Sequence, residues 1–214
     1  MCGAKSKSLI FIGLLFNCLE TVFSANTGFS LSIYDVTSRS IYLRWPKFSG
    51  ASSYRVTATA VNTVGHPLLA HFSDVTLKGT LTSLIPNTVY AIQAEAIDKN
   101  GIILAQTQIM QSTAPDIPVI DQAYSKLSNS ITVEWRAVPG ATSYLLTAQD
   151  GDSFTETVVA NSPGTVTGLK PATLYRITIR SINSGGKSQP SPFRKAKTGG
   201  LSNSYFIFCN VVII

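Results

Sequence analysis

Apolar and polar residues alternate along most of this chain, in short segments separated by turn-forming residues. In the segment 90–98, for example, every second side chain from Tyr90 to Ala96 is apolar. Successive side chains of a strand point to opposite faces, so this pattern predicts a strand with one buried face. Gln93 and Glu95 take the alternate positions and are expected to face outward. The chain is therefore expected to fold as β-structure.

Strands of this kind are predicted in both halves of the chain. In the first half they lie at residues 29–34, 40–45, 54–61, 80–84, 90–98 and 103–111. In the second half they lie at residues 117–124, 130–135, 144–149, 165–169, 175–182 and 193–198. Asn100-Gly101 is the strongest hairpin signal in the chain. Each half is expected to hold about seven strands and to close its own core without disulfides.

A repeated phrase links the two halves. Leu-x-Pro-x-Thr-x-Tyr occurs at residues 84–90 and again at residues 169–175. Trp45 and Trp135 each close a predicted strand upstream of the phrase and stand ninety residues apart. A repeat of that length is too long for a solenoid unit and predicts two tandem copies of one small all-β domain.

The phrase has a physical interpretation. Pro86 and Pro171 lack an N–H for a sheet ladder, so they belong in a loop before the next strand. Tyr90 and Tyr175 then stand at a strand entrance, where a buried ring can bond a backbone group upstream through its hydroxyl. This arrangement is the tyrosine corner of immunoglobulin-like sandwiches. The predicted structural core contains Trp45, Tyr90, Trp135 and Tyr175.

With these tryptophans and Leu-x-Pro-x-Thr-x-Tyr phrases, residues 28–198 resemble fibronectin type III domains. Immunoglobulin domains join their sheets with a cysteine pair, and this chain has no cysteine between Cys18 and Cys209, which favours the type III variant. The resemblance implies two tandem seven-stranded immunoglobulin-like β-sandwiches, at residues 28–114 and 115–198. The order of repeats and the N-terminal segment are also similar to the fibronectin type III domain-containing protein 7 family.

Residues 114–118 connect the two predicted domains and include two prolines. A linker this short and stiff is expected to set the domains end to end as a semi-rigid rod, without a deep cleft between them.

Residues 1–24 are predicted to be a secretory signal peptide. Lys5 and Lys7 form a positive start, residues 9–16 are apolar, and small residues near Ser24 offer a cleavage site. A retained signal anchor is the alternative, although the segment is short for a membrane span. The product is therefore expected to be secreted, and Cys209 is expected to remain as a lone thiol or an intermolecular disulfide partner.

Residues 199–214 are an apolar C-terminal tail of unclear role. Residues 205–214 would extend about 15 Å as a helix, roughly half a bilayer core, so membrane tethering is not expected. A lipid-anchor signal needs a longer polar spacer and a longer apolar tail. The tail fits better with a truncated or alternatively spliced coding sequence.

Several function classes are disfavoured by composition. The net charge of +6 is far from the dense basic face of a nucleic-acid binder. His66 and His71 are expected to be solvated loop residues, because Pro67 resists the helix that a metal pair would need. Asp150-Gly151-Asp152 lacks further oxygen ligands for calcium and is expected to form a turn. No catalytic residue, cofactor or metal is predicted.

Adhesion through integrins is not expected, because neither loop before a domain's last strand contains Arg-Gly-Asp. One basic constellation is left in the second domain, where several members would share one open sheet face. Its members are Arg176, Arg180, Lys187, Arg194, Lys195 and Lys197. It could engage sulfated glycans, or it could simply be a solvated face.

These observations predict a secreted, non-enzymatic extracellular module that binds a protein or acts as a spacer. The alternative is a glycosaminoglycan-binding matrix protein that uses the basic face of the second domain. Nucleic acid is not an expected partner, and the sequence does not identify the protein partner.

Overall fold

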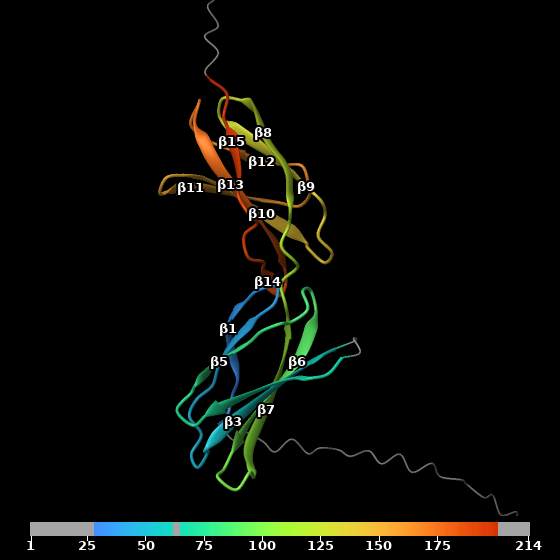
Figure 1. The fold of residues 1–214 in the computed structure, drawn as a ribbon, viewed down its shortest axis with the longest axis vertical. Helices are drawn as coiled ribbons and strands as arrows, with labels where there is room; N and C mark the ends of the chain where they lie inside the picture. Colours follow the sequence, from blue (N-terminus) through green and yellow to red (C-terminus); the bar gives the residue numbers. More distant parts are fainter. Residues whose placement is uncertain (1–27, 62–64, 201–214) are drawn as a thin grey trace, which may run out of the picture.

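The computed structural model describes residues 28–61 and 65–200, and these ranges contain strands and loops but no helix. The strands form two groups that lie one after the other along the long axis of the molecule (Figure 1). We call the group β1–β7 domain 1 and the group β8–β15 domain 2. Each group has its own cluster of buried apolar residues.

Domain 1 is a sandwich of a three-stranded and a four-stranded antiparallel sheet. The first sheet has the order β1-β2-β5, with bounds Ser32–Val36, Ile41–Arg44 and Lys78–Leu81. The second has the order β4-β3-β6-β7, with bounds Leu68–Ser73, Ser53–Ala60, Val89–Ile97 and Ile103–Ser112.

Domain 2 repeats this plan. Its first sheet has the order β12-β9-β8, with bounds Gly164–Thr167, Ser130–Trp135 and Ile120–Leu127. Its second sheet contains β11 (Ser153–Val159), β10 (Ser143–Asp150), β13 (Leu174–Asn183), β14 (Gly186–Lys187) and β15 (Arg194–Lys197). The predicted fold class of two tandem immunoglobulin-like sandwiches is confirmed.

The seventh strand of domain 2 is split into β14 and β15, which both pair with β13. Ser188 and Ser191 lie in the break and are buried. Their hydroxyls accept hydrogen bonds from the backbone N–H groups of Ser181 (3.0 Å) and Ile179 (3.1 Å) on β13. The serines therefore satisfy the part of β13 that an unbroken neighbouring strand would otherwise cover.

Strands β4 and β11 are absent from the sequence-based prediction. Both are edge strands, and their side chains alternate between exposed and half-buried rather than between exposed and buried. The apolar pattern is therefore weak. His71, expected in a loop, lies exposed on β4, opposite Arg55 of β3.

The four predicted core residues are buried. The exposed fractions of Trp45, Tyr90, Trp135 and Tyr175 are 3%, 3%, 4% and 5%. Each tyrosine hydroxyl accepts a backbone hydrogen bond from the loop upstream, at 2.9 Å from Ile85 N in domain 1 and 2.9 Å from Lys170 N in domain 2. The hydroxyl thus acts as an acceptor that holds the loop against the strand.

Changing Tyr175 to Phe is expected to destabilise domain 2 by about 1–2 kcal/mol, because the N–H of Lys170 loses its acceptor while the ring stays in place. Urea unfolding measures the change. Tyr124→Phe is a control on an exposed sheet face of the same domain, and an equal effect of the two substitutions would contradict the role given to Tyr175.

A glycine lies beneath each core tryptophan. A Cβ on Gly79 of β5 would come within 3.0 Å of the Trp45 ring, and one on Gly164 of β12 within 2.9 Å of the Trp135 ring. Neither indole N–H has a hydrogen-bond partner among the described residues. The rings are therefore held by packing, and the two glycines leave the space that they occupy.

Some predictions fall outside the described residues. These are the signal peptide at residues 1–24, Cys209 and all of the apolar tail beyond Gly200. Within residues 28–61 and 65–200, no helix is long and apolar enough to cross a membrane.

Candidate functional site

The basic face of domain 2 lies on β13 and β15. Arg176 of β13 pairs with Lys195 of β15, and Leu174 pairs with Lys197. Opposite residues of an antiparallel pair share a face, so the three cations lie on the outer side of the sheet, and all three are exposed. Arg180 follows Arg176 by four residues on the same side of β13.

The other two predicted members differ from each other. Lys187 pairs with Ile182, which lies on the same side of β13 two residues beyond Arg180, at the end nearest domain 1. Arg194 pairs with Ile177, whose side chain points into the core, so Arg194 lies in the inward register although it is exposed. The register therefore places five of the six predicted cations on the outer side of the sheet, and Arg194 is the exception.

Acidic groups border the basic face. Arg176 and Lys195 line a surface hollow of about 370 Å³ together with Asp150 and Asp152. Asp150 is bound by Lys170, with 3.3 Å between nitrogen and oxygen, whereas the guanidinium of Arg176 lies 4.9 Å from the centre of the Phe193 ring. The carboxylates reduce the positive potential at this end of the face.

Arg180 has a structural contact of its own. Its guanidinium donates to the carbonyl of Ser188 at 3.2 Å, next to the break between β14 and β15. Arg180 is half-buried, so it presents less charge to solvent than Arg176.

Within the described residues, neither the two histidines nor the Asp-Gly-Asp segment forms a metal site. His66 and His71 are both exposed, and Asp150-Gly151-Asp152 forms the β10–β11 hairpin with Gly151 at φ +58. Residues 28–61 and 65–200 contain no group of three or more His, Cys, Asp or Glu side chains that could hold a metal ion.

Two polar clusters lie on sheet faces. Glu95 is on the outward side of β6, as predicted, yet it is only 7% exposed because Arg55 and Gln93 bind its two carboxylate oxygens. The hydrogen bond and charge of Glu95 raise the pKa of the Arg55 guanidinium. In domain 2, the phenol of Tyr124 donates to Glu134 at 2.8 Å, and this bond raises the pKa of Tyr124. Arg55 therefore stays charged and Tyr124 stays neutral at neutral pH.

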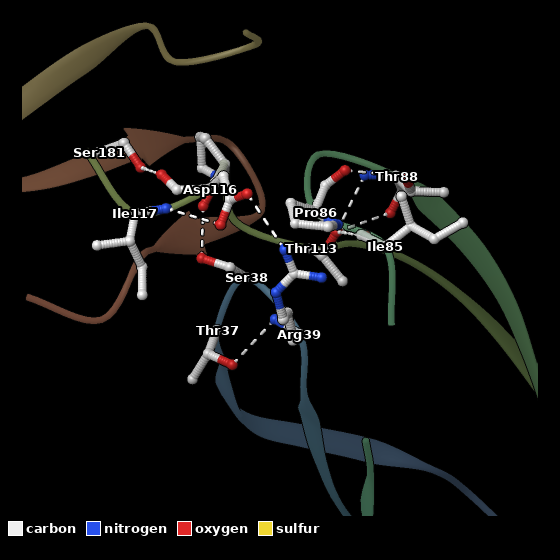
Figure 2. A network of polar contacts seen from close by, with 11 residues as sticks. Thr37, Ser38, Arg39, Ile85, Pro86, Thr88, Thr113, Asp116, Ile117 and Ser181 are labelled. Atoms are coloured by element: carbon white, nitrogen blue, oxygen red, sulfur yellow. Dashed lines mark hydrogen bonds and ion pairs between the residues drawn. The ribbon is translucent and has the colours of Figure 1, made fainter. Parts of the chain in front are cut away.

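The linker between the domains is bound by side chains from both sides (Figure 2). The hydroxyl of Ser38 donates to the carbonyl of Pro115 at 2.5 Å, and Arg39 forms an ion pair with Asp116 at 3.2 Å. From domain 2, the hydroxyl of Ser181 donates to the carbonyl of Asp116 at 2.6 Å. The linker is therefore anchored in addition to being stiffened by its prolines.

The domains also contact each other directly. The side-chain amide of Asn183 donates to Asn87 Oδ1 and to the carbonyl of Thr113, both at 3.1 Å. Gln111 of domain 1 donates to the carbonyl of Gly185 at 3.3 Å. The oxygen of Asn183 accepts the N–H groups of Gly185 and Gly186, which closes the β13–β14 turn. The side chain of Asn183 therefore both closes its own turn, through its oxygen, and binds domain 1, through its NH₂ group.

Sequence reasoning missed these junction residues, since it treated residues 183–192 as an ordinary loop. The available signal was Asn183 followed by Gly185-Gly186. An amide and two glycines suit a turn that another backbone approaches closely, but the sequence does not say which backbone.

Known proteins resemble this chain in sequence and in fold. A family model described as "Fibronectin type III domain" matches residues 121–197. Fibronectin type III domain-containing protein 7 from Homo sapiens is 69% identical over 100 residues, which cover 46% of this chain and 14% of the relative. The Mus musculus protein of the same name is 72% identical over 90 residues, which cover 42% of this chain and 12% of the relative. The chain thus spans a small part of the length of the curated relatives it matches.

Among solved structures, a two-domain fibronectin type III segment of chicken tenascin aligns with a TM-score of 0.42 and 23% identity, covering 79% of this chain and 98% of that one. The fold, the family model and the relatives agree with the repeated tryptophan and tyrosine motifs. The family model thus places a fibronectin type III domain within domain 2, domain 1 repeats the same fold and motifs, and the chain resembles fibronectin type III domain-containing protein 7.

Proposed function

We propose that this chain is a secreted, non-catalytic extracellular module that binds another protein or holds binding partners at a fixed separation. The observation that carries the proposal is the junction, where side chains of both domains bind each other and the linker. Two sandwiches held end to end in this way suit a spacer whose sheet faces stay open along its length (Figure 1).

The open sheet faces carry exposed apolar side chains that could form a protein interface. Exposed apolar side chains lie on strands of both domains, among them Leu69 and Met110 in domain 1 and Phe154 and Val158 in domain 2. Apolar and aromatic side chains of this kind form the buried centre of protein interfaces, with polar residues at the rim.

The spacer role is tested by the distance between the two ends of the molecule. Spin labels at Asn100→Cys and Asn129→Cys, in the full chain with Cys2, Cys18 and Cys209 changed to Ser, are expected to give one narrow distance distribution. A broad distribution would reject the spacer. The same chain expressed in mammalian cells is expected in the medium, and its retention inside the cells would contradict the extracellular assignment.

The second candidate is binding of a sulfated glycan by the outer face of β13 and β15. The cross-strand pair of Arg176 and Lys195, with Lys197 beside it, favours this candidate, because adjacent exposed cations bind sulfate oxygens by charge-assisted hydrogen bonds. Asp150 and Asp152 at the hollow oppose it.

Elution from immobilised heparin separates the two candidates. If the face binds glycan, the double variant Arg176→Ala, Lys195→Ala is expected to elute at clearly lower salt than the unmodified chain, because it loses two of the cations that release counterions. Arg180 is left in place because it supports the loop at Ser188. The matched control is Lys78→Ala with Lys99→Ala in domain 1. Equal shifts for the two double variants would leave only nonspecific charge attraction and reject the glycan site.

A further inference from the structure

Most edge strands of this molecule are protected against pairing with another chain. Within the described residues, the pairings of β1, β7 and β8 contain register shifts, β5 and β12 have four residues each, and β14 and β15 carry Lys187, Lys195 and Lys197. Bulges, short strands and lysine side chains hinder the addition of a further strand. Two edge strands have none of these features, β4 in domain 1 and β11 in domain 2.

β4 and β11 are regular edges. Six residues of β4 pair with β3 and seven residues of β11 pair with β10, without a register shift. Neither strand contains Lys, Arg or Pro. Among their outward side chains, Leu69, Phe154 and Val158 are 58%, 66% and 61% exposed. Both edges are therefore open to a further strand.

On the free edge of β4, every second residue turns its N–H and C=O away from the sheet. Val61, directly after β3, donates its N–H to the carbonyl of Val89 on β6 at 2.8 Å, so the residues of β3 that share its parity face β6 and the others face β4. Carried across to β4, this alternation directs three residues to the free edge: Leu69, His71 and Ser73. Their side chains are the exposed ones of the strand.

The free edge of β11 has the same arrangement. Asp150 and Ser153 are the closing pair of a two-residue turn, so their backbone groups face each other. From this pair, the alternation directs three residues of β11 to the free edge: Phe154, Glu156 and Val158. They too carry the exposed side chains of their strand. The two edges therefore match in the phase of their backbone groups as well as in length.

The side chains of the two edges are complementary in one antiparallel register. With His71 opposite Glu156, an imidazole N–H meets a carboxylate on the outer face. The same register sets Leu69 opposite Val158, and such apolar cross-strand pairs stabilise a sheet. All six residues of β4 then have a partner within residues 154–159.

Pairing of two like edges is less favourable. The register of β11 with itself that pairs Phe154 with Val158 sets Glu156 opposite Glu156, and like charges directly opposite each other are destabilising. The register of β4 with itself that centres on His71 sets Leu69 opposite Ser73, so the apolar pair is lost. The pattern of charge and apolar side chains therefore favours unlike edges.

We propose that this protein associates with a second copy of itself by antiparallel pairing of β4 from one copy with β11 of the other. The sheet that contains β4 then continues into the sheet of the second copy that contains β11. Each copy offers both edges, so the contact propagates into chains unless two copies close it reciprocally. This goes beyond the function proposed above, because the partner is the same chain.

The test is sedimentation of the full chain over a concentration series up to about 1 mM, the range of weak complexes. Cys2, Cys18 and Cys209 are changed to Ser so that disulfides cannot join the copies. A single pair of short strands is a small contact, so reversible association is expected toward the upper end of the series. Glu156→Lys removes the carboxylate opposite His71 and is expected to weaken association about tenfold.

A charge reversal separates this edge contact from other causes of association, such as the apolar tail. His71→Glu alone is expected to weaken association as Glu156→Lys does, because two carboxylates then face each other. The two substitutions together are expected to restore association, because opposite charges face each other again. Thr167→Lys, at an exposed position of the short edge strand β12, is the matched control and is expected to change nothing.

Three results would overturn the proposal. A chain that stays monomeric throughout the series lacks the contact. Association that Glu156→Lys weakens no more than Thr167→Lys arises elsewhere on the molecule. A combined variant that associates as weakly as the two single variants shows that His71 and Glu156 do not face each other.

Discussion

Replacing Gly185 with Ala is expected to separate the two domains without unfolding either. The new Cβ would lie 2.4 Å from the carbonyl oxygen of Ser112 and 2.7 Å from that of Thr113. Both are backbone atoms at the end of β7, so they cannot rotate away as a side chain would. Overpacking of this kind costs about 1–3 kcal/mol, which is comparable to the few interdomain hydrogen bonds at about 0.5–1.5 kcal/mol each.

Small-angle scattering measures the outcome. The variant is expected to lose the scattering profile of a rigid rod and to match an ensemble of interdomain angles, while circular dichroism keeps the β signal. Ser184→Ala is the matched control, because it changes the exposed neighbour in the same turn. An unchanged scattering profile for Gly185→Ala would contradict the role given to the β13–β14 turn.

Replacing Gly164 with Ala is expected to destabilise domain 2 by about 1–3 kcal/mol. The Cβ would lie 2.8 Å from Val159 and 2.9 Å from both Leu146 and the ring of Trp135. Leu146 and Trp135 are buried, so the added methyl group cannot be accommodated by displacing solvent. For a domain of this size, the loss corresponds to about 4–8 °C in Tm per kcal/mol.

Thermal unfolding followed by tryptophan fluorescence checks this prediction. Gly200→Ala is the control, since no atom lies within 4 Å of the position its Cβ would take. Gly79→Ala is expected to have a smaller effect, because the nearest atoms belong to the ring of Phe72, which is half-buried on edge strand β4 and can shift. If Gly164→Ala and Gly200→Ala have the same Tm, the packing beneath Trp135 is loose enough to accept a methyl group, which would contradict this prediction.

The repeated motifs predicted the core residues because the structure that they specify depends only on residues near one another in the sequence. A proline that cannot join a ladder, followed by a strand that opens with tyrosine, specifies a loop and the residue beneath it wherever the rest of the chain goes. Tyr90 and Tyr175 are accordingly found at the start of β6 and β13. The same sequence reasoning missed Gly79 and Gly164, because their importance lies in a ring that packs over them from another strand.

The basic face could be predicted only in part. Alternation places Arg176 and Arg180 on one side of β13, since both belong to one strand. The place of Arg194 depends on register instead. The break at residues 188–193 sets how β15 pairs with β13, and that pairing puts Arg194 opposite the core residue Ile177. A register between strands depends on contacts that periodicity does not contain.

By itself, the sequence determined that this chain is all-β, that it holds two copies of one sandwich and which aromatic rings lie at the centre of each. These properties follow from strand period, turn chemistry and the apolar area that must leave water. Only the tertiary structure decided that the turn at Asn183 docks on domain 1 and that a glycine lies beneath each core tryptophan. The reason is that these contacts join groups distant in sequence, and their meeting depends on how strands and finished sandwiches pack.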